Sequence, residues 1–347
     1  MQIIRPGTPK PNNRTIIPLM SSITVPVQSK DHPHVRSLNV LRDLPHVADL
    51  IELCFSSTMD NDGQRYVNDM RRAGRDDGFL RWANHMTETT SLPLTGYVWD
   101  ENHQIIGNAS LIPFRDRGKR IYLIANVATH PDHRRRGIAR VLTQRAMEHA
   151  RKKNAAAIWL HVRDDNPGAV KLYADLGFQE VARRTTWQAN SDPHLLKPYS
   201  DVQIIARHPR FWPVQQDWLR RLYPDALNWY SSLNFSALRP GFWNWVYLLF
   251  MEFDMKQWAA VSKRDGENLL ATLTWMPRGG RSESIYAATG DEQKDESGEA
   301  LTQILLHARR ALSNHATLSL EYPADEMTRA ISAAGFKPRR TLIWMSA

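Results

Sequence analysis

Cysteine is almost absent from this chain, which contains only Cys54 among its 347 residues. One thiol excludes an intramolecular disulfide framework and is typical of a reducing compartment. The chain also lacks any apolar run approaching the roughly 20 residues that a membrane helix requires. Residues 1–30 are rich in proline, serine and asparagine and show no clear signal-peptide pattern. We therefore expect a cytoplasmic protein that begins with a flexible tail over residues 1–30.

Metal-ligand spacing is missing as well. His130 and His133 have no spaced metal-ligating partners, so we expect surface histidines and no bound metal.

The net charge of +9 is uneven, because residues 1–190 contain 27 Lys+Arg against 19 Asp+Glu, whereas residues 191–347 contain 18 against 17. A basic patch can indicate nucleic-acid binding, but a compact polyanionic ligand explains this local excess equally well, and we find no basic strand interleaved with aromatic residues.

Hydrophobic periodicity predicts an α+β protein with a mixed, mostly antiparallel sheet. A short strand and then a helix occupy residues 35–55, and polar, helix-prone sequence follows over residues 56–91. Three strands, a helix, a strand, a second helix and a last strand are then predicted. Their residues are 96–99, 105–113, 121–128, 136–153, 156–162, 169–178 and 180–188.

A weak internal repeat links the two halves of the chain. Leu176–Phe178 has a counterpart in Ala334–Phe336 at an offset of 158 residues, and Gly137–Ala139 has one in Gly298–Ala300. Such self-similarity indicates a duplicated unit. We therefore expect two tandem domains of one fold, over residues 31–190 and 200–347.

The segment HPDHRRRGIAR, residues 130–140, stands where a strand is predicted to become a helix. The first turn of a helix presents unpaired N–H groups and the positive end of the helix dipole. Gly137 removes the Cβ that would keep a phosphate from this backbone, and arginine forks match phosphate geometry. The segment is thus either an anion-binding turn or a solvated basic turn.

Two longer segments resemble the signatures of the GCN5-related N-acetyltransferase (GNAT) superfamily. In NVATHPDHRRRGIARVL, residues 126–142, Arg134, Gly137 and Ala139 fill the three defining places of the first signature. WLHVRDDNPGAVKLYADLGF, residues 159–178, resembles the second signature. Its matching members are Asn166, Ala169, Leu172, Tyr173, Gly177 and Phe178. The resemblance implies two tandem GNAT-like domains, each with helices flanking its sheet, and acetyl transfer from acetyl-CoA to a primary amine by direct attack.

The resemblance also implies roles for individual positions. Tyr173 would protonate the departing thiolate, and Asn166 would bond the pantetheine arm or the acceptor. Main-chain groups of three residues would bond the pantetheine arm and polarise the thioester carbonyl, namely Val127, Ala128 and Thr129. The pyrophosphate would lie against residues of the basic segment, namely Arg134, Arg135, Arg136, Gly137, Ile138, Ala139 and Arg140.

The sequence departs from the family at the general base. The two places where relatives carry a glutamate hold Ala125 and His161 here, so His161 is our candidate base. A core histidine is the alternative, and Glu88 and Asp100 are candidates without motif support. Packing is the alternative for Tyr173, and Asn166 before Pro167 can be a helix cap alone.

The second copy is predicted to be degenerate. Where the first copy has its basic segment, the second has four carboxylates, namely Asp291, Glu292, Asp295 and Glu296, and Ile331 takes the place of Tyr173. We expect an active N-terminal domain, with a non-catalytic CoA-binding regulator as the alternative. The acceptor would be a small-molecule or peptide amine. We expect no membrane or nucleic-acid partner for the protein, which would be a monomer or a homodimer.

Overall fold

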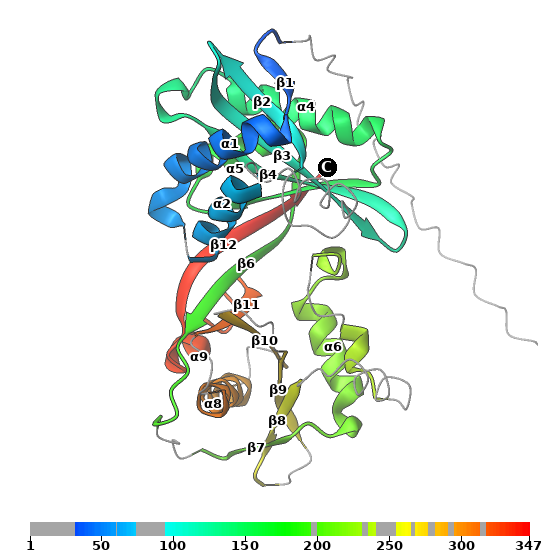
Figure 1. Ribbon diagram of the computed structural model, residues 1–347. Helices are drawn as coiled ribbons and strands as arrows, with labels where there is room; N and C mark the ends of the chain where they lie inside the picture. Colours follow the sequence, from blue (N-terminus) through cyan, green and yellow to red (C-terminus); the bar gives the residue numbers. More distant parts are fainter. Residues whose placement is uncertain are drawn as a thin grey trace, which may run out of the picture.

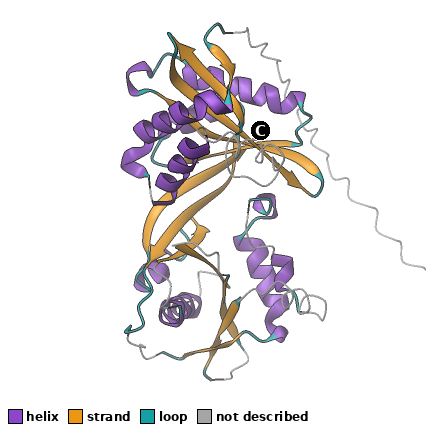
Figure 2. Cartoon of the chain, in the orientation of Figure 1, coloured by secondary structure: helices purple, strands orange, loops and turns teal. Residues whose placement is uncertain are grey.

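The computed structural model describes residues 32–59, 61–73, 94–195, 200–230, 235–240, 255–264, 268–276, 282–290, 295–312 and 317–347. The tail predicted for residues 1–30 lies outside the described residues. The described elements form an α+β protein in which helices cover both faces of a mixed sheet (Figures 1 and 2). No helix among them is long and apolar enough to cross a membrane.

The first half follows the order that the sequence predicts. Helix α4 starts at Ile138 because Gly137, with a φ of 80°, is its N-cap. The elements are β1 (Val35–Ser37), α1 (Val40–Phe55), η1 (Ser56–Thr58), α2 (Asn61–Ala73), β2 (Thr95–Glu101), β3 (Gln104–Asp116), β4 (Lys119–Thr129), η2 (Pro131–His133), α4 (Ile138–Lys152), β5 (Ala157–Arg163), α5 (Pro167–Asp175) and β6 (Gln179–Ala189).

The second half repeats much of this pattern. Its strands β10 and β11 pair in parallel, as β4 and β5 do in the first half. Its elements are β7 (Val202–Ala206), η3 (Pro209–Phe211), α6 (Trp212–Leu222), η4 (Asp225–Leu227), η5 (Phe235–Leu238), β8 (Lys256–Ser262), β9 (Leu269–Trp275), β10 (Ser282–Thr289), α8 (Asp295–Ala311), β11 (Thr317–Pro323), α9 (Thr328–Ala333) and β12 (Lys337–Ser346).

One pair of glycines has the same conformation in both halves, and a second pair does not. Gly177 and Gly335 both follow a short helix with left-handed φ values of 91° and 80°, a conformation that glycine adopts without the steric cost of a Cβ. Gly298, which the sequence pairs with Gly137, lies inside α8 instead of before a helix. The second half therefore begins its helix earlier and has no glycine N-cap at this place.

The two halves share one continuous sheet, because each contributes its last strand to the other. The strand order is β1-β2-β3-β4-β5-β12-β6-β11-β10-β9-β8-β7. Strand β12 lies antiparallel between β5 and β6, and β6 in turn pairs with β11. In Figure 1 these two long strands, green and red, run side by side between the halves. The sequence repeat alone does not predict this exchange.

The two faces of the sheet have different cores in the first half. Val98 packs with α1 and α2, whereas its neighbour Trp99 packs with α4 on the opposite face. This alternation follows from the two-residue period of a strand.

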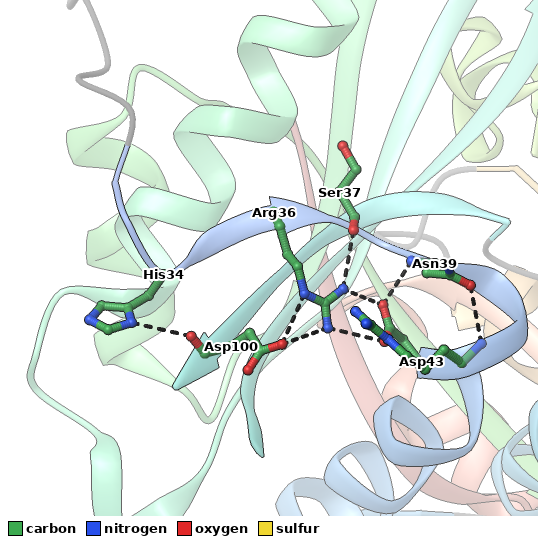
Figure 3. Close-up of polar contacts among 7 residues, drawn as sticks. His34, Arg36, Ser37, Asn39, Asp43 and Asp100 are labelled. Atoms are coloured by element: carbon green, nitrogen blue, oxygen red, sulfur yellow. Dashed lines mark hydrogen bonds and ion pairs between the residues drawn. The ribbon is translucent and has the colours of Figure 1, made fainter. Parts of the chain in front are cut away.

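An ion cluster fixes the start of α1 (Figure 3). Arg36 donates to Asp100 over 2.9 Å and to Asp43 over 2.5 Å, while the main-chain N–H of Asn39 also donates to Asp43. Burial raises the pKa of Asp43, but the hydrogen bonds from Arg36, Asn39 and Arg42 outweigh it, so the pKa stays below its ordinary value. The cluster thereby sets the direction in which α1 runs toward β4.

Deleting residues 337–347 tests the strand exchange. Without β12, strands β5 and β6 lose their shared partner, and unpaired edges in the middle of a sheet favour aggregation. We expect the shortened chain to lose cooperative thermal unfolding by circular dichroism, and a synthetic peptide of residues 335–347 to restore it. A shortened chain that unfolds cooperatively near the temperature of the full chain would contradict the exchange.

Candidate functional site

Strands β4 and β5 pair along only about half of their length. Their parallel pairing runs from Ile121 with Ala157 to Ile124 with Leu160 and stops there. Just beyond, Asn126 has a φ of 52° and the register between β3 and β4 shifts, which marks a bulge. A bulge bends the strand that carries it. The end of β4 therefore diverges from β5 and leaves an opening in the sheet.

Side chains from three elements hold this bulge in place. The amide of Asn126 donates to the hydroxyl of Tyr66 over 2.8 Å, and its main-chain oxygen accepts from Asn108 over 2.8 Å. Asparagine tolerates a left-handed backbone better than most residues. The opening thus follows from the sequence of β4, and hydrogen bonds to α2 and β3 hold it in place.

A cavity of about 820 Å³ occupies the opening and extends to the start of α4. The only predicted site residues that do not line it are Arg136 and His161. The predicted residues that do line it are Val127, Ala128, Thr129, Arg134, Arg135, Gly137, Ile138, Ala139, Arg140, Asn166 and Tyr173. Residues separated by up to 46 positions in sequence therefore meet on one concave surface.

The loop before α4 exposes its backbone to this cavity. Arg135 and Gly137 both have left-handed φ values, 67° and 80°, and a Cβ built at Gly137 would meet nothing within 4 Å. The main-chain bond from Val141 to Gly137 is the first of the helix, so the preceding amides have no helical acceptor. Backbone amides and free space at a helix start form a seat for an anion.

The arginines of this loop divide into two groups. Arg136 is bound to Glu101 at 2.9 Å and turns away from the cavity, and Arg140 pairs with Asp175 at 3.0 Å. Within the described part of the chain, Arg134 and Arg135 have no carboxylate partner. Two guanidinium groups on the cavity wall are therefore available to an anionic ligand.

Helix α5 supplies the two polar residues of the second signature. Asn166 caps the helix, because its side-chain oxygen accepts from the N–H of Ala169 over 3.1 Å. Tyr173 is buried, its ring packs against Phe178, and burial raises the pKa of its phenol well above the ordinary value. Its hydroxyl has no hydrogen-bond partner among the described residues, so it remains a free donor on the cavity wall.

A second cavity, of about 290 Å³, meets the first at this point. It shares part of its lining with the larger cavity, including Val127, Asn166 and Tyr173, and adds Tyr66, Asn126, His161 and Arg340 among others.

His161 reaches the second cavity from the face of β5 opposite Tyr173. Leu160 and Val162 pack with Tyr173, whereas the His161 ring contacts Trp344 on the other face. His161 and Tyr173 therefore lie on opposite faces of β5, and both line the smaller cavity.

The environment of His161 makes it a weak base. Burial, together with the positive charge of Arg340, lowers the pKa of the imidazole to about 4. His161 is consequently neutral near pH 7 and can accept a hydrogen bond, but it holds a proton poorly. Of the other base candidates, Asp100 is bound to Arg36 and lines neither cavity, and Glu88 lies outside the described residues.

Comparison with known proteins agrees with this geometry. Residues 60–178 match the family model of the "Acetyltransferase (GNAT) family". The chain is similar in structure to a GCN5-related N-acetyltransferase from Sphaerobacter thermophilus, with a TM-score of 0.56 and 14% identity over 91% of this chain and 96% of that one. Residues 60–178 therefore carry a GNAT domain, and the whole chain has a GNAT-like fold. Members of this superfamily use acetyl-CoA.

Two further likenesses show how far the resemblance extends. A tandem GNAT protein from the clavulanic acid biosynthesis pathway is similar in fold, with a TM-score of 0.50 and 15% identity over 90% of this chain and 98% of that one. The [ribosomal protein bS18]-alanine N-acetyltransferase of Escherichia coli (strain K12) is 36% identical over 67 residues, which are 19% of this chain and 45% of that protein. The chain thus spans less than half the length of this curated relative.

In the second half, side chains bond to the end of β10, the strand that corresponds to β4. Tyr223 is buried and donates to the main-chain oxygen of Ala287 over 3.1 Å, and Arg221 donates to Thr289 over 2.9 Å. The register between β9 and β10 continues without a bulge. Ile331, at the place of Tyr173, is fully buried in the core. Of the predicted carboxylate run, residues 291–294 lie outside the described residues.

Aromatic residues of the second half also reach the first half. The Trp229 ring lies 5.7 Å from that of Trp159, and the Tyr230 ring lies 4.7 Å from that of Trp344, which in turn contacts His161. Tyr230 is 47% exposed. These rings form core packing at the junction between the halves and continue to the surface beside the smaller cavity.

Sequence reasoning missed the lining residues that lie outside the two GNAT signatures. Cys54, Phe55 and Thr58 come from the end of α1 and from η1, and Cys54 donates to the main-chain oxygen of Thr129. Tyr66 comes from α2 and Arg340 from the exchanged strand β12. The sequence gives only a weak signal that the end of α1 lines the cavity. It gives no such signal for Arg340, because Arg340 belongs to the other half of the chain.

Replacing Gly137 with glutamate tests the anion seat. The new side chain would project into the open space before α4 and bring negative charge to it, so we expect CoA binding by calorimetry to weaken about tenfold or more, since each 1.4 kcal/mol corresponds to a factor of ten. Gly118→Glu is the matched control, because Gly118 has the same φ of 80° and the same open surroundings but lines neither cavity. Equal CoA affinity in both variants would contradict this seat.

Proposed function

We propose that the first half of the chain transfers an acetyl group from acetyl-CoA to a primary amine, and that the second half is not catalytic. The observation that carries this proposal is the meeting of two cavities at the opening between β4 and β5, where both are lined by Tyr173 and Val127. Such a passage lets a donor and an acceptor lie in contact without sharing a pocket. Holding two reactants together in this way removes much of the entropic barrier to their reaction.

The larger cavity fits acetyl-CoA in size and chemistry. The left-handed Gly137, the free amides of the first turn of α4 and the guanidinium groups of Arg134 and Arg135 suit a pyrophosphate. Deeper in the cavity, main-chain groups of residues 127–129 would hold the pantetheine arm and polarise the thioester carbonyl. Bound acetyl-CoA supplies an activated acyl group on a thiol leaving group.

Tyr173 is placed to serve the leaving group. Its raised pKa keeps the phenol protonated at every working pH, and the hydroxyl has no competing acceptor among the described residues. We propose that Tyr173 donates its hydrogen bond, and then its proton, to the departing thiolate. Asn166 caps α5 and lines both cavities, which supports a role in holding this end of the helix against the reactants.

The acceptor amine attacks as the free base. No carboxylate lines the smaller cavity in the described part of the chain, and His161 has a pKa of about 4. We propose that His161 accepts a hydrogen bond from the amine or from a bridging water and orients it. The same lack of a strong base favours the alternative of a CoA-binding regulator, and thiol release from acetyl-CoA with a panel of amines decides between the two.

Changing Tyr173 to phenylalanine tests the leaving-group role. We expect kcat to fall about 100-fold or more, in line with the loss of a general acid, while the Kd of CoA stays unchanged. Tyr97→Phe is the control, because the Tyr97 hydroxyl bonds His149 over 3.0 Å and lies outside both cavities. If Tyr173→Phe retained the activity of Tyr97→Phe, the proposed acid would be wrong.

Changing His161 to asparagine separates orientation from base catalysis. We expect kcat/KM to fall less than about tenfold, whereas loss of a general base costs roughly 100- to 10,000-fold. Because the pKa of His161 is about 4, the imidazole is already neutral at pH 6. The pH profile of kcat/KM above pH 6 should therefore follow the amine and be the same in both proteins. A profile limb that disappears in the variant would identify His161 as the base.

A further inference from the structure

We infer that Tyr66 binds the acceptor, by donating a hydrogen bond to an uncharged oxygen that the acceptor carries close to its amine, as an amino alcohol does. The inference rests on the proposed function and names the substrate class of the same site. It is carried by the direction of the hydrogen bond between Asn126 and Tyr66 and by the place of both residues on the wall of the smaller cavity.

Tyr66 reaches the smaller cavity from helix α2. Its hydroxyl lies 2.8 Å from the side-chain nitrogen of Asn126, the residue at the bulge of β4. Both residues line the smaller cavity, and neither lines the larger one. Tyr66 therefore lies on the acceptor side of the proposed site, beside the edge of the opening that β4 forms.

The direction of this hydrogen bond leaves the phenol proton of Tyr66 unused. The Asn126 amide is the donor, so the phenol oxygen is the acceptor, and the described contacts give the hydroxyl proton no acceptor of its own. Burial raises the pKa of Tyr66 to about 12, and the hydrogen bond from Asn126 offsets only part of this rise. The phenol thus keeps its proton near pH 7. A donor that is buried without an acceptor is unfavourable, so an oxygen of a bound ligand would complete this site.

A buried network fixes the amide that orients Tyr66. Asn126 also donates to the hydroxyl of Ser110 over 3.4 Å. Asn108 donates to the same hydroxyl over 3.1 Å and to the main-chain oxygen of Asn126 over 2.8 Å. Asn108 and Ser110 are both fully buried. The side-chain nitrogen of Asn126 is therefore shared between Ser110 and Tyr66, and the phenol oxygen is held in one place.

Most other polar side chains on the wall of this cavity already have partners. Those with partners are Thr58, Arg163, Asn166 and Arg340. Tyr173 serves the leaving group in the proposed function. Tyr66 therefore remains as a donor for the acceptor molecule, and the neutral imidazole of His161 remains as an acceptor of hydrogen bonds.

Tyr66 and His161 offer complementary contacts to one small molecule. The cavity has a volume of about 290 Å³, which limits the distance between groups on its wall. His161 would accept a hydrogen bond from the amine, and Tyr66 would donate one to an oxygen of the same molecule. Apolar side chains, including Ile51, Val67 and Leu342, form much of the remaining wall. Burying a charge costs more than burying a hydroxyl that is hydrogen-bonded, so these walls favour an uncharged oxygen.

The experiment compares two amino alcohols, ethanolamine and leucinol, each with the alkylamine in which a methyl group replaces the hydroxyl. The members of each pair have nearly the same shape, so a difference within a pair reports the oxygen. Thiol release from acetyl-CoA is measured and kcat/KM is expressed per free amine, because a hydroxyl also lowers the pKa of a neighbouring amine. The proteins are the unmodified chain, Tyr66→Phe and the control Tyr97→Phe, whose hydroxyl lies outside both cavities.

We expect the unmodified protein to favour each amino alcohol over its methyl counterpart about tenfold or more in kcat/KM, because the methyl group leaves a buried donor unpaired. Tyr66→Phe should remove this preference by raising KM for the amino alcohols, while the activity toward the alkylamines and the Kd of CoA by calorimetry stay unchanged. Tyr97→Phe should keep the preference. A purely structural role of Tyr66 would not change the ratio within a pair.

The results that would overturn the contact differ from those that would overturn the proposed function. Equal values within each pair for the unmodified protein, or a preference that survives in Tyr66→Phe, would show that Tyr66 does not bind the acceptor oxygen. So would a loss by the same factor for both members of a pair, which a role in holding the bulge alone would produce. Acetyl transfer itself stands in all these cases. Failure of the unmodified protein to bind CoA, or to release thiol with any amine, would overturn the proposed function instead.

Discussion

The bulge at Asn126 is the constraint on which the site depends. It ends the pairing of β4 with β5 after four residue pairs, and two hydrogen bonds hold it, one that Asn126 donates to Tyr66 and one that Asn126 accepts from Asn108. All other parts of the site are arranged around this opening. Helix α4 starts at one side of it, Tyr173 faces it from α5, and His161 faces it from the other side of the sheet. In the second half, the described pairing of β9 with β10 has no such bulge, and the Tyr223 hydroxyl donates to Ala287 of β10.

The exchange of β6 and β12 makes the two halves interdependent. A degenerate half that only packed against its neighbour would stabilise it and contribute no chemistry. Here the second half supplies Leu342 and Arg340 to the smaller cavity and Trp344 to the contact with His161. The electrostatic environment of His161 thus depends in part on Arg340, which is about 180 positions away from His161 in the sequence.

Local sequence features predicted much of the fold and of the larger cavity. Gly137 and the Asn166–Pro167 pair act through their own backbone, so their structural effects can be read from neighbouring residues. The side-chain direction of Arg136 was not predictable, because it depends on Glu101 in a different hairpin. The pKa of His161 depends on Arg340, which is adjacent only after strand exchange. Gly298 shows that a sequence repeat can survive where the backbone conformation has changed.

The position of β12 after the other strands of the described sheet has a consequence for biosynthesis. The first half is translated first, yet its sheet lacks the strand between β5 and β6 until Lys337–Ser346 have emerged from the ribosome. Pairings between distant residues are slow to form, and exposed strand edges attract other chains meanwhile. Residues 157–189 therefore spend the synthesis of the entire second half without their native partner. Premature termination of translation would leave a protein whose two GNAT signatures are complete and whose central sheet is not.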